Sequence, residues 1–194
     1  MSQFIDNLKE ITECLQNQGD IFIKPSEDVI TVTQNVLKSK KKLFVCGNGG
    51  SAATASHIAN DLACHMKNWN RDGYRVICLN DSVAVITSLT NDYGFEQVFS
   101  KPLEALGNEG DVLWGFSTSG NSKNVIQAVK TTKKMGMKSV VFTGRSGGML
   151  KGLGDIWVPV NSDDVIRVEE LHLIYAHSIA VCVEAMISPV EEIS

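Results

Sequence analysis

Histidine and carboxylate side chains recur at helical spacing in one stretch of the chain. His57, Asp61 and His65 follow one another at intervals of four residues, so they project from one side of a helix expected over 52–67. A histidine and a carboxylate one turn apart can bind a metal ion. Alternatively, one of them can transfer a proton while the other holds it in the right orientation. A solvated helix face with a surface ion pair would show the same spacing, so both interpretations stay open at this point.

A second group of such residues lies on a helix expected over 165–187. This helix carries Glu169, Glu170, His172 and His177 among apolar residues. Glu169 and His177 are eight residues apart, which corresponds to about 12 Å of helix rise. They can serve one site only if long side chains converge or if different subunits supply them. The alternative is a set of capping acids with one core histidine.

Two small, polar segments follow apolar segments of β-strand character. Residues 47–51 follow the segment 43–46, and residues 117–122 follow the segment 111–116. Glycines between a strand and a helix bring backbone N–H groups close to a ligand, and a helix N-terminus attracts anions. Neither a G-x-G-x-x-G pattern nor a Lys-Ser/Thr P-loop ending is present. We therefore expect a sugar-phosphate site rather than a nucleotide site, with ordinary helix capping as the alternative.

The remaining pattern alternates strands with helices. Strands are expected at 43–46, 75–79, 111–116, 139–143 and 156–160, and helices at 52–67, 82–90, 95–106, 165–187 and from 122 to about 135, with a short helix from 149. This alternation predicts an α/β fold with an open parallel five-stranded sheet covered by helices on both faces. Its site should lie at the carboxyl ends of the strands.

Two further helices are expected before the first strand. Apolar residues at helical spacing predict one over 4–18. Pro25 interrupts the pattern, and Ser26 is expected to cap a second helix that reaches about Lys38. Neither helix belongs to the α/β repeat, so their surplus apolar surface suits packing against another subunit.

The composition is typical of one globular domain of 194 residues, with 43% hydrophobic and 21% charged residues. A net charge of -4 argues against a nucleic-acid partner, whose usual footprint is a basic patch. We expect no membrane span, because no apolar run approaches about 20 residues, and no signal peptide. The five cysteines are dispersed and odd in number, which suggests reduced thiols in the cytoplasm.

Taken together, these motifs resemble the sedoheptulose-7-phosphate isomerase (phosphoheptose isomerase) family, which has the sugar-isomerase (SIS) fold. The segments that carry the resemblance are 46–51, 91–95, 104–107, 117–122 and 167–172, the last followed by His177. The resemblance covers nearly the whole chain. It implies a single three-layer SIS domain over 1–194, with strands in flavodoxin-like order and the helices of residues 1–40 serving oligomerisation.

The resemblance also assigns roles by position. The substrate-binding positions are Asn48, Gly49, Gly50, Ser51, Asn91, Asp92, Ser117, Thr118, Ser119, Ser122 and Glu169. Among these, the phosphate would be held by Ser51, Ser117, Ser119 and Ser122. The metal, a zinc ion in characterised relatives, would be bound by His57, Asp61, Glu169 and His177. Asp61 would carry the proton, and His177 would act as a second acid/base or as a metal ligand.

Three positions depart from the family pattern. Asp61 stands where the family has a glutamate, Glu169 where it has a glutamine, and His65 where it has an arginine. Two histidines with two carboxylates still suit Zn²⁺, and also suit Mn²⁺ or Fe²⁺. The missing arginine removes a fixed bidentate clamp for an anion. The framework is thus that of the family, while the reacting centre is altered.

The implied activity is an aldose–ketose isomerisation. It would convert sedoheptulose 7-phosphate to D-glycero-D-manno-heptose 7-phosphate through an enediol, without a nicotinamide or nucleotide. Two alternatives remain: an isomerase of another sugar phosphate, or a non-catalytic SIS protein like the relative that associates with the bacterial replication initiator. The presence of both His57 and His177 favours an enzyme. The family also implies a homotetramer, with each site shared between subunits.

Overall fold

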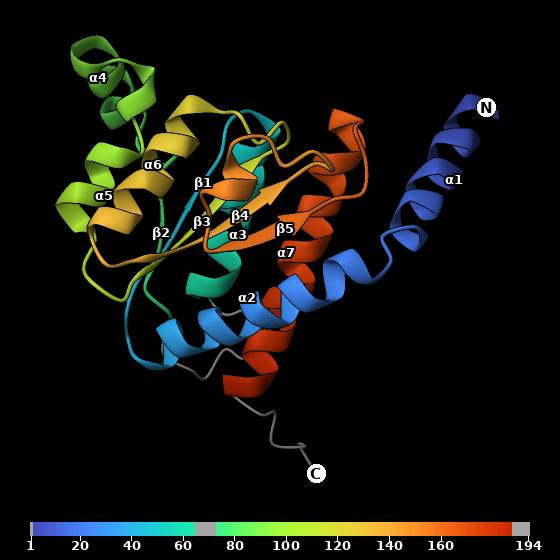
Figure 1. Ribbon diagram of the computed structural model, residues 1–194, viewed down its shortest axis with the longest axis horizontal. Coiled ribbons are helices and arrows are strands. Elements are labelled where there is room, and N and C mark those ends of the chain that lie inside the picture. The colour runs from blue at the N-terminus through green and yellow to red at the C-terminus, as the bar shows by residue number, and fades with distance from the viewer. Residues whose placement is uncertain (1, 65–72, 188–194) are drawn as a thin grey trace.

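Five parallel strands form the central sheet, in the order β2-β1-β3-β4-β5 (Figure 1). The computed structural model describes residues 2–64 and 73–187. The strands are β1 (Leu43–Cys46), β2 (Val76–Cys78), β3 (Val112–Ser117), β4 (Lys138–Thr143) and β5 (Ile156–Pro159). The predicted sheet and its flavodoxin-like order are confirmed. The strand order changes direction between β1 and β3, and this is the switch point at which such sheets bind ligands.

Alternation along each strand divides the core into two layers. In β1, Leu43 and Val45 belong to one hydrophobic cluster, and Phe44 and Cys46 belong to the other. Every residue of β1 and β3 is buried, as expected for strands that are covered on both faces.

The helices are α1 (Ser2–Gln16), α2 (Asp20–Lys38), α3 (Gly50–Cys64), α4 (Val83–Tyr93), α5 (Ser100–Leu106), α6 (Lys123–Lys134) and α7 (Val165–Ile187).

Different helices cover the two faces of the sheet. The first cluster joins the sheet to α2, α3 and α7, and the second joins it to α5 and α6. Helix α7 is, within the described residues, the one helix long and apolar enough to cross a membrane by length and composition. Its residues Val168, Leu171, Ala176 and Ile179 are buried in the first cluster. The apolar character of α7 therefore matches its place in the core.

The predicted helix break at Pro25 is wrong. Helix α2 begins at Asp20 and continues through Pro25, its sixth residue, although proline at this position removes one hydrogen bond within the helix. The Ser26 hydroxyl does not cap a helix but donates to the Phe22 carbonyl at 2.8 Å. The Phe22 ring stacks on that of Tyr175, with 3.5 Å between the ring centroids, and so holds the first turn of α2 against α7.

Other elements differ from expectation in extent. The helix expected over 95–106 is divided into a 3₁₀ turn, η1 (Phe95–Gln97), and α5, and the segment after Met149 is a second 3₁₀ turn, η2 (Leu150–Gly152). The end of the helix expected over 52–67 lies outside the described residues. Helix α1 lies at the edge of the molecule (Figure 1), and its residues Phe4, Ile5, Leu8 and Leu15 are exposed.

Candidate functional site

The loop between β1 and α3 is held in place by two asparagines outside it. The Asn80 amide donates to the Gly47 carbonyl at 2.8 Å, and its carbonyl oxygen accepts from the Gly47 N–H at 3.2 Å. Asn124, at the start of α6, exchanges two hydrogen bonds with Asn48, at 2.8 and 2.9 Å. The loop is thereby tied to the end of β2 on one side and to α6 on the other.

Two glycines give this loop its shape. Gly49 has a φ of 57°, in the left-handed region that favours glycine. At Gly50 a Cβ atom would collide with the Glu169 carboxylate, so α3 begins with an acidic side chain of α7 lying against its first residue. The predicted substrate position Gly50 therefore faces the predicted site residue Glu169.

The second polar loop follows β3. The Ser117 and Ser122 hydroxyls lie 2.8 Å apart, and the Ser119 hydroxyl accepts from the Asn121 N–H at 3.2 Å. Thr118 and Ser119 line a cavity of about 160 Å³ at the carboxyl ends of the strands. Four of the predicted binding residues thus lie in one loop beside β1, as the switch point requires.

Two predicted binding residues, Asn91 and Asp92, lie elsewhere. They are exposed near the end of α4, where the Asn91 amide donates to the Asp92 carboxylate at 2.8 Å. Helix α4 has no buried residues, and it stands at the edge of the molecule beside η1 (Figure 1). In the described part of the chain, α4 packs mainly on η1 rather than on α3 or α7, the helices that carry the histidines.

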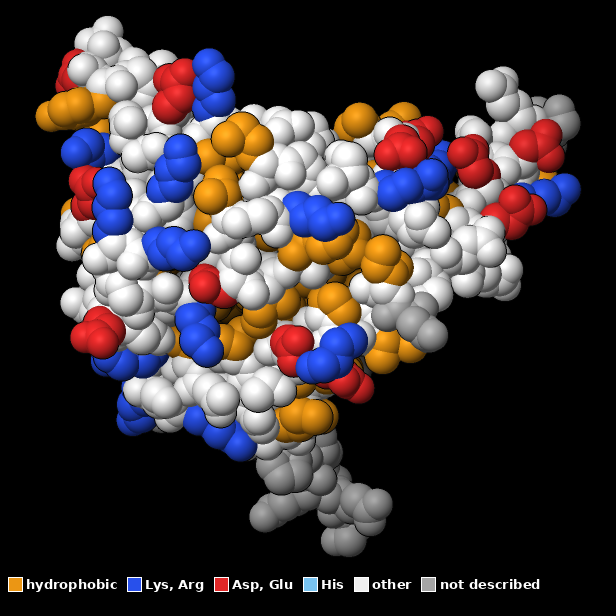
Figure 2. Space-filling view, in the orientation of Figure 1, with side chains coloured by type: hydrophobic (Ala, Val, Ile, Leu, Met, Phe, Trp, Pro, Cys, Tyr) orange, Lys and Arg blue, Asp and Glu red, His pale blue; other side chains and the backbone are white. Residues whose placement is uncertain are grey.

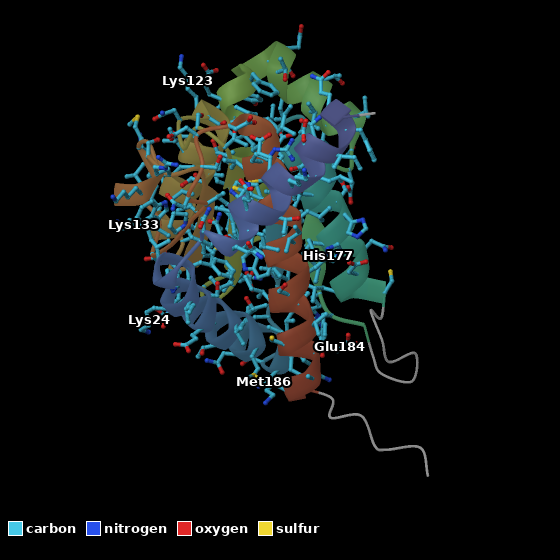
Figure 3. The ribbon with its side chains drawn as sticks, turned by 90° about the vertical axis from the view of Figure 1, so that its right-hand side faces the viewer. Lys24, Lys123, Lys133, His177, Glu184 and Met186 are labelled. Carbon is cyan, nitrogen blue, oxygen red and sulfur yellow. The ribbon has the colours of Figure 1, made fainter. Side chains whose placement is uncertain are left out.

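A cluster of two imidazoles and one carboxylate joins α3 to α7. His57 and His177 approach to 2.9 Å between their Nε2 atoms. Asp61 Oδ2 lies 3.4 Å from His57 Nε2 and 3.1 Å from His177 Nε2. His177 projects from α7 toward α3 in Figure 3. The four-residue spacing places His57 and Asp61 on one side of α3, and the packing of α3 on α7 adds His177.

The geometry of this cluster fits a divalent metal ion. Tetrahedral zinc with bonds of 2.0–2.1 Å to nitrogen and oxygen places its donor atoms about 3.3 Å apart. The three separations in the cluster lie between 2.9 and 3.4 Å, so small shifts would bring all three atoms onto one ion. His57, Asp61 and His177 are also the metal-ligand types that zinc, manganese and iron(II) share.

The three-residue cluster is assembled within one chain, where Asp61 and His177 lie 3.1 Å apart. The sharing of each site between subunits stays a prediction. Glu169 is not part of the three-residue cluster. Instead it lines a neighbouring cavity of about 310 Å³ together with Gly50, His57 and Glu170. His65 lies outside the described residues.

Two positioning residues were not found from the sequence. They are Asn80 and Asn124. The sequence did offer one signal for them, which is their position at the carboxyl edge of the sheet: Asn80 follows a strand, and Asn124 lies at the start of a helix. His172, in contrast, has no place in the site: it is fully buried, and its ring lies 5.9 Å from that of Phe116. It is a core histidine.

Together, the fold and site define an SIS-domain protein. The model of the SIS domain family matches residues 3–144. The chain is 42% identical over 177 residues to the phosphoheptose isomerase of Helicobacter pylori (strain P12), covering 91% of this chain and 88% of the relative. It is 36% identical to the phosphoheptose isomerase of Aliarcobacter butzleri (strain RM4018), covering 97% of both chains.

A solved structure supports the same assignment. Phosphoheptose isomerase GmhA from Neisseria gonorrhoeae superimposes with a TM-score of 0.89 at 33% identity, covering 95% of this chain and 98% of that one. The chain belongs to the phosphoheptose isomerase family.

Proposed function

We propose that this protein is an isomerase that converts sedoheptulose 7-phosphate to D-glycero-D-manno-heptose 7-phosphate. The observation that carries the proposal is the Asp61 carboxylate, held between two imidazoles beside hydroxyl-rich loops, in a chain of the phosphoheptose isomerase family. Aldose–ketose isomerisation moves a proton between adjacent carbons through an enediol. It needs a carboxylate to carry that proton and a partner that handles the oxygen-bound proton.

Asp61 is the group assigned to proton transfer. Its side chain is 18% exposed, and its Oδ2 lies within 3.4 Å of both imidazoles. These neighbours orient the carboxylate toward the junction of α3 and α7. Asp61 is one methylene shorter than the family's glutamate, so the sugar must approach the backbone of α3 more closely. His177 is assigned to proton transfer at the sugar oxygens or to metal binding.

We assign His57, Asp61, Glu169 and His177 to one divalent cation, with Zn²⁺ as the proposed ion. Bound there, the cation would polarise the oxygens of the reacting carbons. The three clustered residues supply donors at metal-binding separations. Glu169 would complete the set from the neighbouring cavity by a change of side-chain rotamer, because it and His57 line the same space.

The phosphate is assigned to the two polar loops. Ser117, Ser119 and Ser122 lie in the loop before α6, and Ser51 lies in the first turn of α3. Hydroxyl groups and free N–H groups at helix N-termini bind phosphate without a lysine. Asn48, Gly49, Gly50 and Thr118 are assigned to the sugar, together with Asn91 and Asp92.

The proposed active unit is a cytoplasmic homotetramer. Its support is apolar surface left open by one chain: Phe4 is 61% exposed on α1, and Val83 is 73% exposed on α4. Figure 2 shows further hydrophobic side chains between the charged residues of one face. Because α4 has no fully buried residue and packs on the core through the partly buried Ile86 and Leu89, assembly is also the way in which Asn91 and Asp92 would come near a site. Light scattering should give the mass of four chains, and a monomer with full activity would contradict this assignment.

One preparation of the purified protein tests both alternatives to this function, which are a non-catalytic binding protein and an isomerase of another sugar phosphate. A non-catalytic binding protein is not favoured, because the relatives are named isomerases and the cluster of Asp61 with two histidines is present. Turnover should be compared across ketose phosphates of five, six and seven carbons. Highest activity on the seven-carbon sugar is expected, and preference for a shorter one would reassign the substrate within the same chemistry.

A further inference from the structure

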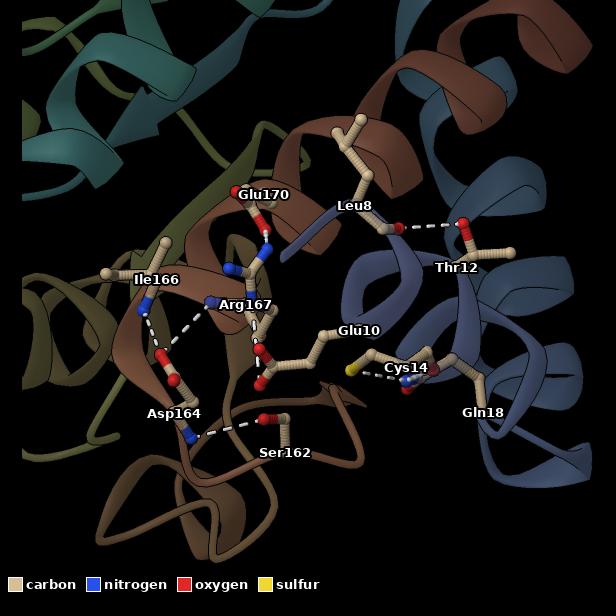
Figure 4. Close-up of polar contacts among 10 residues, drawn as sticks. All are labelled: Leu8, Glu10, Thr12, Cys14, Gln18, Ser162, Asp164, Ile166, Arg167 and Glu170. Atoms are coloured by element: carbon tan, nitrogen blue, oxygen red, sulfur yellow. Dashed lines mark hydrogen bonds and ion pairs between the residues drawn. The ribbon is translucent and has the colours of Figure 1, made fainter. Parts of the chain in front are cut away.

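Arg167 is a nearly buried cation at the junction of α7 and α1 (Figure 4). It is 8% exposed, and its Nη1 donates to Glu170 Oε2 at 2.6 Å. Its Nε lies 3.9 Å from Glu10 Oε1 on α1 and forms no hydrogen bond within the described part of the chain. A guanidinium this far from water requires a carboxylate partner, and Glu170 is the one in close contact.

Glu170 connects this ion pair with the metal cavity. It lines the same cavity of about 310 Å³ as His57 and Glu169, and no lysine or arginine is found among the described lining residues. Asp61 lies beside His57 in the cluster, so three carboxylates gather around one cation site. The charge of one divalent ion neutralises two of these carboxylates. Among the described residues, the cation in contact with the third, Glu170, is the guanidinium of Arg167.

We propose that Arg167 is a positioning residue that holds and neutralises Glu170, so that the metal-loaded cavity presents no surplus negative charge to a phosphorylated sugar. This inference rests on the proposed function. A free Glu170 would repel a substrate that carries a phosphate dianion, and would increase the attraction of the cavity for a cation.

The test is the charge-removing variant Arg167→Met, compared with the double variant Arg167→Met/Glu170→Gln. Arg167→Met should bind Zn²⁺ more tightly by about threefold or more in calorimetry, and should raise KM for sedoheptulose 7-phosphate by about threefold or more. The change in kcat should be smaller. The double variant removes both charges and should restore the wild-type value of each quantity.

A control variant removes the cation of an exposed ion pair that does not line the cavity. Lys24 pairs with Asp28 at 2.6 Å on the exposed face of α2 (Figure 3). Lys24→Met removes the same charge and should change neither Zn²⁺ affinity nor KM. Arg167→Lys, which keeps the charge, should stay near wild type in both.

Two results would overturn the inference. One is a lower melting temperature of Arg167→Met with unchanged Zn²⁺ affinity and KM, which would make Arg167 a structural residue. The other is a double variant that retains the altered values. If Arg167→Met does not fold, Glu170→Gln decides: its Zn²⁺ affinity should fall by about threefold, and no change would contradict the inference. A wild-type protein that leaves sedoheptulose 7-phosphate unchanged would refute the proposed function, while the Zn²⁺ comparison would still test Arg167.

Discussion

Replacing His172 by phenylalanine should weaken the pH dependence of the unfolding free energy in mildly acidic solution. His172 lies on α7 with its ring against the stacked rings of Phe116 and Phe142, at 5.9 and 6.1 Å between centroids. Neither ring nitrogen has a hydrogen-bond partner of normal geometry among the described residues. Burial therefore lowers the pKa of His172 from 6.5 to about 4, and the Thr143 backbone opposes this shift only in part.

The sign and size of the effect follow from proton binding. As the pH falls from 6.5 toward 4, the unfolded chain protonates His172 while the native protein keeps it neutral. The unfolded state is thus favoured as the pH falls, and the stability present above pH 6.5 is lost. Each unit of pKa difference is worth about 1.4 kcal/mol, so the loss from this residue approaches about 3 kcal/mol near pH 4.

Urea unfolding of the chelator-treated protein at pH 7 and pH 4.5 measures this loss. Between these conditions, wild type should lose about 2–3 kcal/mol more than His172→Phe. Tyr175→Phe is the matched control, because Tyr175 is buried on the same helix and burial raises its pKa, so it carries no charge in this range. Equal losses in wild type and His172→Phe would refute the argument.

Three further predictions concern the loops and the cluster. Asn124→Ala removes the two amide hydrogen bonds that hold Asn48. It should lower the free energy of unfolding, measured with urea, by about 1–2 kcal/mol and should raise KM. If both quantities stay unchanged, the pair does not fix the loop. The double variant Ser119→Ala/Ser122→Ala should bind the sugar phosphate about tenfold or more weakly in calorimetry, with an unchanged circular dichroism spectrum. An affinity equal to that of wild type would place the phosphate elsewhere. His57→Ala should lose stoichiometric metal in elemental analysis, and full retention would remove His57 from the ligand set.

The sheet could be predicted because its strands are short apolar segments that end at glycine or polar residues. Both faces of β1 and β3 are covered, so these strands are apolar up to Ser117 at the end of β3 and are easy to recognise. The start of α2 could not be predicted in this way. Local sequence suggested a break at Pro25, whereas the stacking of Phe22 on Tyr175 favours an earlier start through a contact across the fold.

The site was predictable to the extent that helical spacing determines it. His57 and Asp61 share one side of α3 because they are four residues apart. Their approach to His177 depends on how α3 packs on α7, which no spacing within either helix reveals. The ties from Asn80 and Asn124 are also long-range, since they join loops far apart in the chain.

Proton transfer by Asp61 is tested most directly by proton NMR of sedoheptulose 7-phosphate incubated with enzyme in D₂O. Wild type should produce signals of the aldose phosphate and should introduce deuterium at the reacting carbon. Asp61→Asn, which keeps the size of the side chain but cannot accept the proton, should lower both rates by about 10²–10⁴-fold. Isomerisation by Asp61→Asn at the wild-type rate, or no conversion by metal-loaded wild type, would contradict the account.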